Sequence, residues 1–262
     1  MKKNLFKLFT LLFAISLFVV SCDEVSLDDP EIDLETTSDL AFASGAVGDV
    51  FGAVHNGTGG GKSATSCNPA VVYNLETGIM TITYPEGCIG DDGVARQGVI
   101  HATFSGGWLP GATVTITFEN YYHNGKKLTG TITGTYVSGG DQPVFTIVAT
   151  GMVLDFSTMK PDGNTVTWDS EKTITWLEGV DTPLDKSDDA WQTTGVTEGV
   201  ARNGKSFRNE ATDLVKVPTC KWFISGTLEI TIGEEGDSKT YLMEFSEPCG
   251  TVTFTTSLGI PI

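Results

Sequence analysis

The residue with the most defined chemistry near the start of the chain is Cys22, because of what precedes it. Three lysines lie among the first seven residues, and an apolar run follows over residues 8–20. A run of this length fits the roughly 7–15 apolar residues of a secretory signal and is shorter than the roughly 18 that suggest a membrane-spanning helix. The run ends in Val19-Val20-Ser21-Cys22, so a thiol directly follows a small residue.

This ending resembles the lipobox of bacterial lipoproteins. The resemblance implies that residues 1–21 are a lipoprotein signal peptide and that cleavage occurs before Cys22. It also implies diacylglycerol on the sulfur of Cys22 and a third acyl chain on its new amino group. The alternative is an ordinary secretory signal that a cysteine follows by chance. With several acyl chains the mature protein is held durably at a membrane through its lipid.

The four other cysteines suit disulfide bonds, because thiols oxidise outside the cytoplasm and their number is even. Four cysteines allow three pairings. We favour the two local ones, Cys67–Cys88 and Cys220–Cys249, since each pair brackets one hairpin-like stretch. The alternative is a zinc site with four thiolate ligands, but the chain has no Cys-x-x-Cys spacing.

The net charge excludes one class of partner. Removal of residues 1–21 takes away three lysines and no acid, which changes the formal net charge from −17 to −20. Nucleic acid requires lysine and arginine to neutralise its phosphates, so we expect no nucleic-acid partner.

Catalytic chemistry has little support in the residue pattern. The chain contains no Gly-x-Ser-x-Gly motif, and the cysteines are assigned to lipid or disulfides, so a hydrolytic nucleophile is missing. A glycosidase instead needs two carboxylates about 5–10 Å apart. Glu86 and Glu247, each close to a strand-end cysteine, are the first candidates for such a pair. We expect no enzyme activity, with a polysaccharide hydrolase as the alternative.

Two acidic loops raise the question of a calcium site. Asp181, Asp185, Asp188 and Asp189 crowd one loop, and Asp91-Asp92-Gly93 forms another. Calcium prefers several oxygen ligands from one loop, but neither run matches an EF-hand. We therefore expect solvated loops, no metal and no cofactor other than the lipid on Cys22.

Aromatic side chains are the best candidates for ligand contacts. Trp108 follows two glycines and precedes Pro110, and Trp191 follows an acidic loop, so both are expected to be exposed. Tyr121 and Tyr122 adjoin a predicted turn. Together with these tryptophans they could stack against sugar rings. Trp168 and Trp176 fall in alternating strands and are expected in the core.

Three short segments precede the main domain. Residues 22–37 are acidic without a basic residue, which predicts an extended tether. Over residues 38–55 apolar side chains recur at helical spacing, with Ser38 placed as the N-cap, which predicts a short helix. Residues 56–66 are rich in glycine and predict a flexible linker.

From residue 67 to residue 262 the pattern changes to alternating apolar and polar residues, which predicts strands. Asn124-Gly125 and Asn203-Gly204 are typical of tight hairpin turns. The expected fold is all-β, an antiparallel meander of roughly ten strands preceded by one short helix. The meander could form a sandwich, a barrel or an open curved sheet. The domain could also consist of two diverged halves that meet near residues 177–189.

The acids that directly follow Cys22 resemble the surface-export signal of lipoproteins from the Bacteroidota, and residues 67–262 resemble β-rich exported lipoproteins of that group with no known activity. The resemblance implies an outer-membrane lipoprotein, with the cell surface favoured over the periplasmic face. The expected function is that of a non-catalytic binding or structural module whose partner is a glycan or an envelope protein.

Overall fold

The computed structural model describes residues 33–58, 67–90, 93–106, 109–157, 165–182, 187–220, 223–234, 236–248 and 251–256. Leu34–Ile262 forms one compact unit. Within the described residues, no helix has the length and apolarity needed to cross a membrane.

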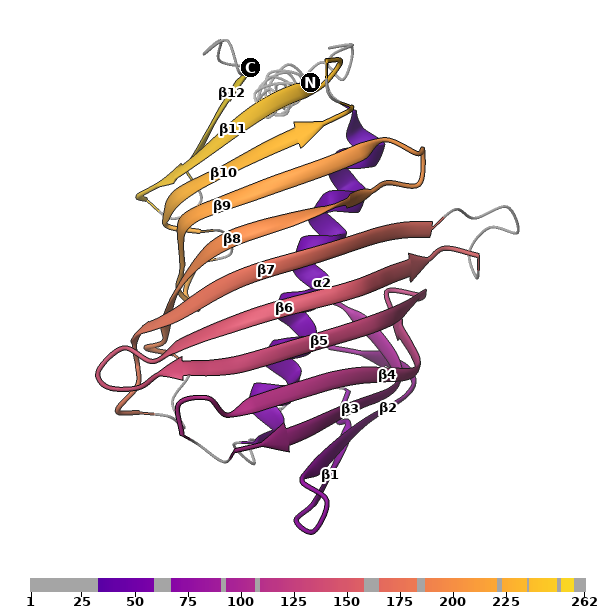
Figure 1. The fold of residues 1–262 in the computed structure, drawn as a ribbon, viewed down its shortest axis with the longest axis vertical. Helices are drawn as coiled ribbons and strands as arrows, with labels where there is room; N and C mark the ends of the chain where they lie inside the picture. Colours follow the sequence, from indigo (N-terminus) through magenta and orange to yellow (C-terminus); the bar gives the residue numbers. More distant parts are fainter. Residues whose placement is uncertain are drawn as a thin grey trace, which may run out of the picture. The chain divides into compact units, whose positions relative to one another are not determined.

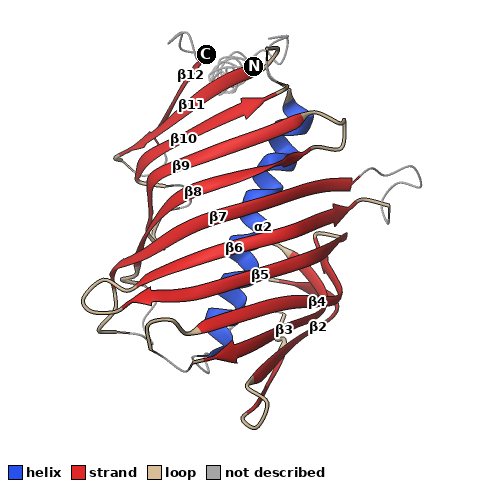
Figure 2. Ribbon diagram, viewed as in Figure 1, coloured by secondary structure: helices blue, strands red, loops and turns tan. Residues whose placement is uncertain are grey.

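In its described residues the unit consists of one helix and one antiparallel sheet of twelve strands in sequence order (Figures 1 and 2). The helix is α2 (Leu34–Thr58). The strands are β1 (Ala70–Asn74), β2 (Ile79–Ile89), β3 (Ala95–Ser105), β4 (Thr113–His123), β5 (Lys126–Ser138), β6 (Val144–Asp155), β7 (Thr165–Glu178), β8 (Ala190–Val200), β9 (Ser206–Lys216), β10 (Ser225–Ile232), β11 (Lys239–Ser246) and β12 (Thr251–Thr256).

The predicted all-β meander is confirmed, and its sheet is open, with β1 and β12 as its edges. The sheet has twelve strands where roughly ten were predicted, and β1, β8 and β9 carry the weakest sequence signals. Every residue of β1 is exposed, so β1 lacks the alternation that marks a half-buried strand. In β8 and β9 the inner positions include glycine, threonine and asparagine, which weaken the apolar signal.

The sheet has one buried face. Along β7 the alternate residues Val166, Trp168 and Ser170 are buried, while the threonines and acids between them are exposed. We call the buried side, against which α2 packs, the inner face, and the opposite side the outer face. In Figures 1 and 2 α2 runs behind the strands and across them.

Helix α2 is longer than predicted at both ends, since residues 34–37 and 56–58 are also helical. Ser38 therefore lies inside the helix and is not its N-cap. The apolar positions that predicted the helix are the ones that pack on the sheet. Leu40, Ala43, Val47, Val50 and Val54 are all buried.

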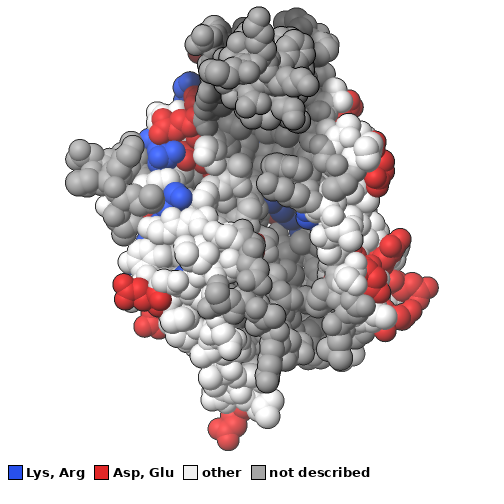
Figure 3. All heavy atoms as spheres, turned by 180° about the vertical axis from the view of Figure 1, so that it is seen from behind, with Lys and Arg blue, Asp and Glu red and all other residues white. Residues whose placement is uncertain are grey.

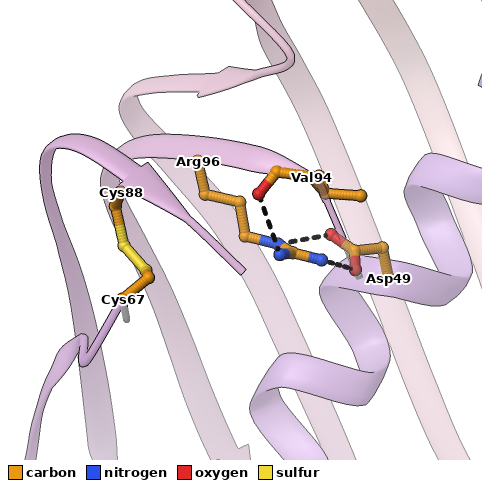
Figure 4. Close-up of a disulfide and its surroundings, with 5 residues drawn as sticks. All are labelled: Asp49, Cys67, Cys88, Val94 and Arg96. Carbon is orange, nitrogen blue, oxygen red and sulfur yellow. Dashed lines mark hydrogen bonds and ion pairs between the residues drawn. A yellow bond between two sulfur atoms is a disulfide. The ribbon is translucent and has the colours of Figure 1, made fainter. Parts of the chain in front are cut away.

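Two clusters of charged side chains fix α2 to the inner face. At the β8–β9 turn, Arg202 Nε donates to Asp39 Oδ1 at 2.8 Å, and the Arg202 backbone N–H donates to Oδ2 at 3.0 Å. On β3, Arg96 donates to both carboxylate oxygens of Asp49 (Figure 4). His123 Nε2 lies 3.2 Å from Asp49 Oδ2. Burial alone would raise the pKa of Asp49, but His123 and Arg96 outweigh it, so this pKa is lowered.

The disulfide Cys67–Cys88 is present, as predicted (Figure 4). It ties the start of the domain to β2, a short distance from the ion pair between Arg96 and Asp49. Cys220 is buried and also disulfide-bonded. Its predicted partner, Cys249, lies outside the described residues, so this pairing stays a prediction.

Candidate functional site

The aromatic residues singled out from the sequence lie in different environments. Trp108, like the lipidation candidate Cys22, is outside the described residues. Tyr121 is fully buried, with its ring stacked on Phe118, so it presents no surface for a ligand. Tyr122 is half-buried near the β4–β5 turn. Trp191, on β8, is half-buried on the inner face and belongs to a larger aromatic group.

That group, which we call the aromatic row, crosses four neighbouring strands on the inner face. Trp176 and Trp191 are opposite each other on β7 and β8 and stack with their ring centroids 4.7 Å apart. The ring centroid of Phe145 on β6 lies 6.5 Å from that of Trp191, and the ring centroid of Tyr136 on β5 lies 5.3 Å from that of Phe145. Trp176 is 7% exposed, whereas the other three rings are half-buried. The row therefore presents several ring surfaces side by side.

Two hairpins and one buried carboxylate position the row. Tyr136 and Phe145 flank the β5–β6 connection, and Trp176 and Trp191 flank the β7–β8 connection, so antiparallel pairing brings all four rings to one end of the sheet. The indole N–H of Trp176 donates to Asp189 Oδ1 at 3.1 Å. Because Asp189 is buried, this bond holds the Trp176 ring in one orientation.

Two lysines, Lys216 and Lys172, lie near the aromatic row on the inner face. Lys216 lies opposite Trp191 in the β8–β9 register, and its ammonium group donates to the backbone carbonyl of Cys220. Lys172 is on β7, four residues before Trp176. Burial lowers the pKa of both amines. Figure 3 views this side of the molecule, where one patch of basic side chains lies deep near the middle and other basic side chains lie at the left margin beside acidic ones.

The acidic β7–β8 loop borders the row. A hollow of about 350 Å³ there is lined by Asp141, Glu178, Asp181 and Asp188, among other residues. Asp188 accepts a hydrogen bond from Thr182 Oγ1 at 2.6 Å. Across the described part of the chain, no group of histidine, cysteine and acidic side chains has the arrangement of a metal site. Asp91, Asp92 and Asp185 lie outside that part.

A larger open hollow of about 770 Å³ lies at the end of the sheet where β8 turns into β9. Its lining includes Asp169 and Glu198, which are direct neighbours in the β7–β8 register, and Arg208, which is opposite Glu198 on β9. Both carboxylates are exposed. The backbone N–H of Gly151 donates to Asp169 Oδ1 at 2.6 Å.

The carboxylate pair suggested by the sequence is not brought together. Glu86 lies on β2, and Glu247 follows β11. Eight strands separate β2 from β11 in the sheet, at about 4.8 Å per step. A single catalytic site containing both residues is therefore excluded.

Comparison with known proteins adds no assignment. The chain matches no protein-family model, no curated protein and no solved structure at a significant level.

Proposed function

We propose that the protein is an exported lipoprotein, anchored through Cys22, whose β domain is a non-catalytic binding module at the cell envelope. The lipobox and the acidic segment that follows it support the anchor and its location in the outer membrane, with the domain at the cell surface. The half-buried aromatic rings on the inner face support the binding role.

The observation that carries the binding role is the aromatic row. Its half-buried rings, Tyr136, Phe145 and Trp191, lie in one continuous group on the inner face. Flat aromatic surfaces pack against the apolar faces of sugar rings, and polar groups at the edge then provide hydrogen bonds. The proposed ligand class is therefore an envelope or extracellular glycan.

Isothermal titration calorimetry tests this role, because its signal does not depend on Trp191. The full chain in detergent is titrated with neutral and acidic oligosaccharides. Trp191→Ala is expected to weaken binding at least tenfold, about 1.4 kcal/mol. Tyr73→Ala is the matched control, since Tyr73 is 46% exposed on the edge strand β1, far from the row. Equal loss in both variants, or no binding by the parent protein, would reject the role.

The anchor is tested separately by fractionation. Cys22→Ala is expected to move the protein from the membrane fraction to the soluble fraction, and retention in the membrane would contradict lipidation. Protease treatment of intact and lysed cells then distinguishes surface display from a periplasmic location.

A polysaccharide hydrolase is the second candidate, favoured by Asp169 and Glu198. Direct cross-strand neighbours have Cβ atoms about 5 Å apart, which is compatible with the carboxylate spacing of a retaining glycosidase. A general acid, however, needs a carboxyl group that its surroundings keep protonated, and both of these are exposed. The hydrolase would be established if the parent protein released reducing ends from a polysaccharide and the Glu198→Gln variant did not.

A further inference from the structure

Lys172 occupies an unusual position for a lysine. It points to the inner face from the middle of β7, two residues after Ser170 and two before Ile174. Its cross-strand neighbours are Ile147 on β6 and Gly195 on β8, and neither carries a charge. The lysine is half-buried, and burial lowers its pKa from 10.5 to about 8 with no contribution from a charged neighbour.

No hydrogen bond or ion pair joins the Lys172 ammonium group to another described residue. Removing a charged amine from water is costly unless an acceptor replaces the water. The other buried cations of the inner face have such acceptors, since Arg202 contacts Asp39 and Arg96 contacts Asp49. Lys172 therefore has no protein acceptor among the described residues, which leaves its ammonium group available to an anionic ligand.

Further hydrogen-bonding groups without partners lie along the same strip. Ser170 on β7 is two residues before Lys172, and it pairs with Thr197 on β8. Both hydroxyls are buried without a hydrogen-bond partner among the described residues. The same holds for the indole N–H of Trp168, two residues before Ser170. The strip from Trp168 to Lys172 thus holds buried hydrogen-bonding groups without partners and contains no carboxylate on its inner positions.

We propose that Lys172 binds the carboxylate or sulfate group of an acidic sugar whose ring packs on the aromatic row. This proposal rests on the proposed function and specifies its ligand. Phe145 is the member of the row diagonal to Lys172 in the β6–β7 register. The Cα atoms of diagonal neighbours on adjacent strands are about 7 Å apart. One sugar unit therefore spans the distance between the ring surface and the ammonium group.

The charges around the row orient this ligand. Acidic side chains surround the β7–β8 loop, where Glu178 is six residues from Lys172 along β7, or about 20 Å. They repel an anion from that side of the row. Lys172 attracts it on the opposite side. The anionic group of the ligand consequently points away from the loop and toward the middle of the sheet.

Matched pairs of oligosaccharides test the proposal. The full chain in detergent is titrated by calorimetry with oligogalacturonate, oligomannuronate and sulfated oligogalactan, each beside its neutral counterpart of the same backbone. The expected result is that at least one acidic member binds ten times or more tighter than its neutral counterpart. Lys172→Met should abolish this preference. Lys127→Met should preserve it, because Lys127 lies on the outer face of β5.

Each outcome has a distinct meaning. Equal binding of acidic and neutral members by the parent protein, or a preference that survives Lys172→Met, overturns the role of Lys172. The glycan-binding role then stands if Trp191→Ala still weakens binding. Absence of binding by every oligosaccharide overturns both proposals. Thermal unfolding of the Lys172→Met variant checks that lost binding does not reflect lost folding.

Discussion

Replacing Lys172 with methionine is expected to stabilise the fold while it removes anion binding. Methionine has a similar length and carries no charge, so it keeps the packing between Ile147 and Gly195 without a desolvated ammonium group. The pKa of Lys172 is lowered from 10.5 to about 8. Each pKa unit corresponds to about 1.4 kcal/mol, so the charged form destabilises the folded state by up to about 3 kcal/mol.

The free energy of unfolding should change with pH in a defined direction. Between pH 8 and pH 10.5 the unfolded chain keeps a proton on Lys172 that the folded chain has lost. The free energy of unfolding therefore rises with pH across this window, relative to a variant without the amine. Denaturant unfolding of the parent chain and Lys172→Met, at pH 7 and pH 10, measures the difference. Lys172→Met should be more stable by up to about 3 kcal/mol at pH 7, and the advantage should shrink toward pH 10.

Lys127→Met is the control for this measurement, because Lys127 lies on the outer face of β5 and its replacement should change stability by less than about 0.5 kcal/mol. A Lys172→Met variant that is less stable than the parent, or a stability difference that does not vary with pH, would refute the reasoning. Either result would mean that Lys172 has an acceptor or full hydration in solution.

Four further predictions concern the scaffold. Gly48→Ala should raise the free energy of unfolding by about 1 kcal/mol in denaturant titrations, since an added methyl group at this exposed helical site meets no atom within 4 Å. Asp39→Ala should lower it by about 2 kcal/mol, because a partly buried guanidinium loses its shortest hydrogen bonds to a carboxylate and keeps the longer contact with Glu35. Serine at both Cys67 and Cys88 should cost about 3 kcal/mol, measured against the parent under non-reducing conditions. Val72→Lys should reduce aggregation in light scattering without loss of stability, because Val72 is 64% exposed on an uncharged edge strand.

The architecture was predictable where local patterns decide it. Alternating residues and the turns at Asn124-Gly125 and Asn203-Gly204 predicted a meander, because hairpins pair strands that are adjacent in sequence. The acids of α2 show the limit of such patterns. Asp39 and Asp49 look like solvent-facing charges in the sequence, but their arginine partners come from distant parts of the chain, 163 and 47 residues away. No local pattern contains that information.

The candidate site was predictable only in part. Trp191 was expected to contact ligand, whereas Tyr136, Phe145 and Lys172 were not identified. The position of Lys172 was indicated by the sequence, since it lies four residues from both Trp168 and Trp176 in a predicted strand. Residues separated by an even number point to the same face of a strand, here the inner face. The aromatic row depends on the register between four strands, which includes irregularities in β5, β6 and β7. One residue of slip would turn each side chain to the other face, so residue type alone could not assemble the row.

The most direct test of a ligand site on the inner face is hydrogen–deuterium exchange of the full chain, with and without the tightest-binding oligosaccharide. Protection is expected in the backbone around the aromatic row and Lys172, on β6, β7 and β8, with β1 unchanged. Protection confined to the hollow lined by Asp169, Glu198 and Arg208 would contradict the account. It would direct attention to the paired carboxylates and to hydrolysis instead.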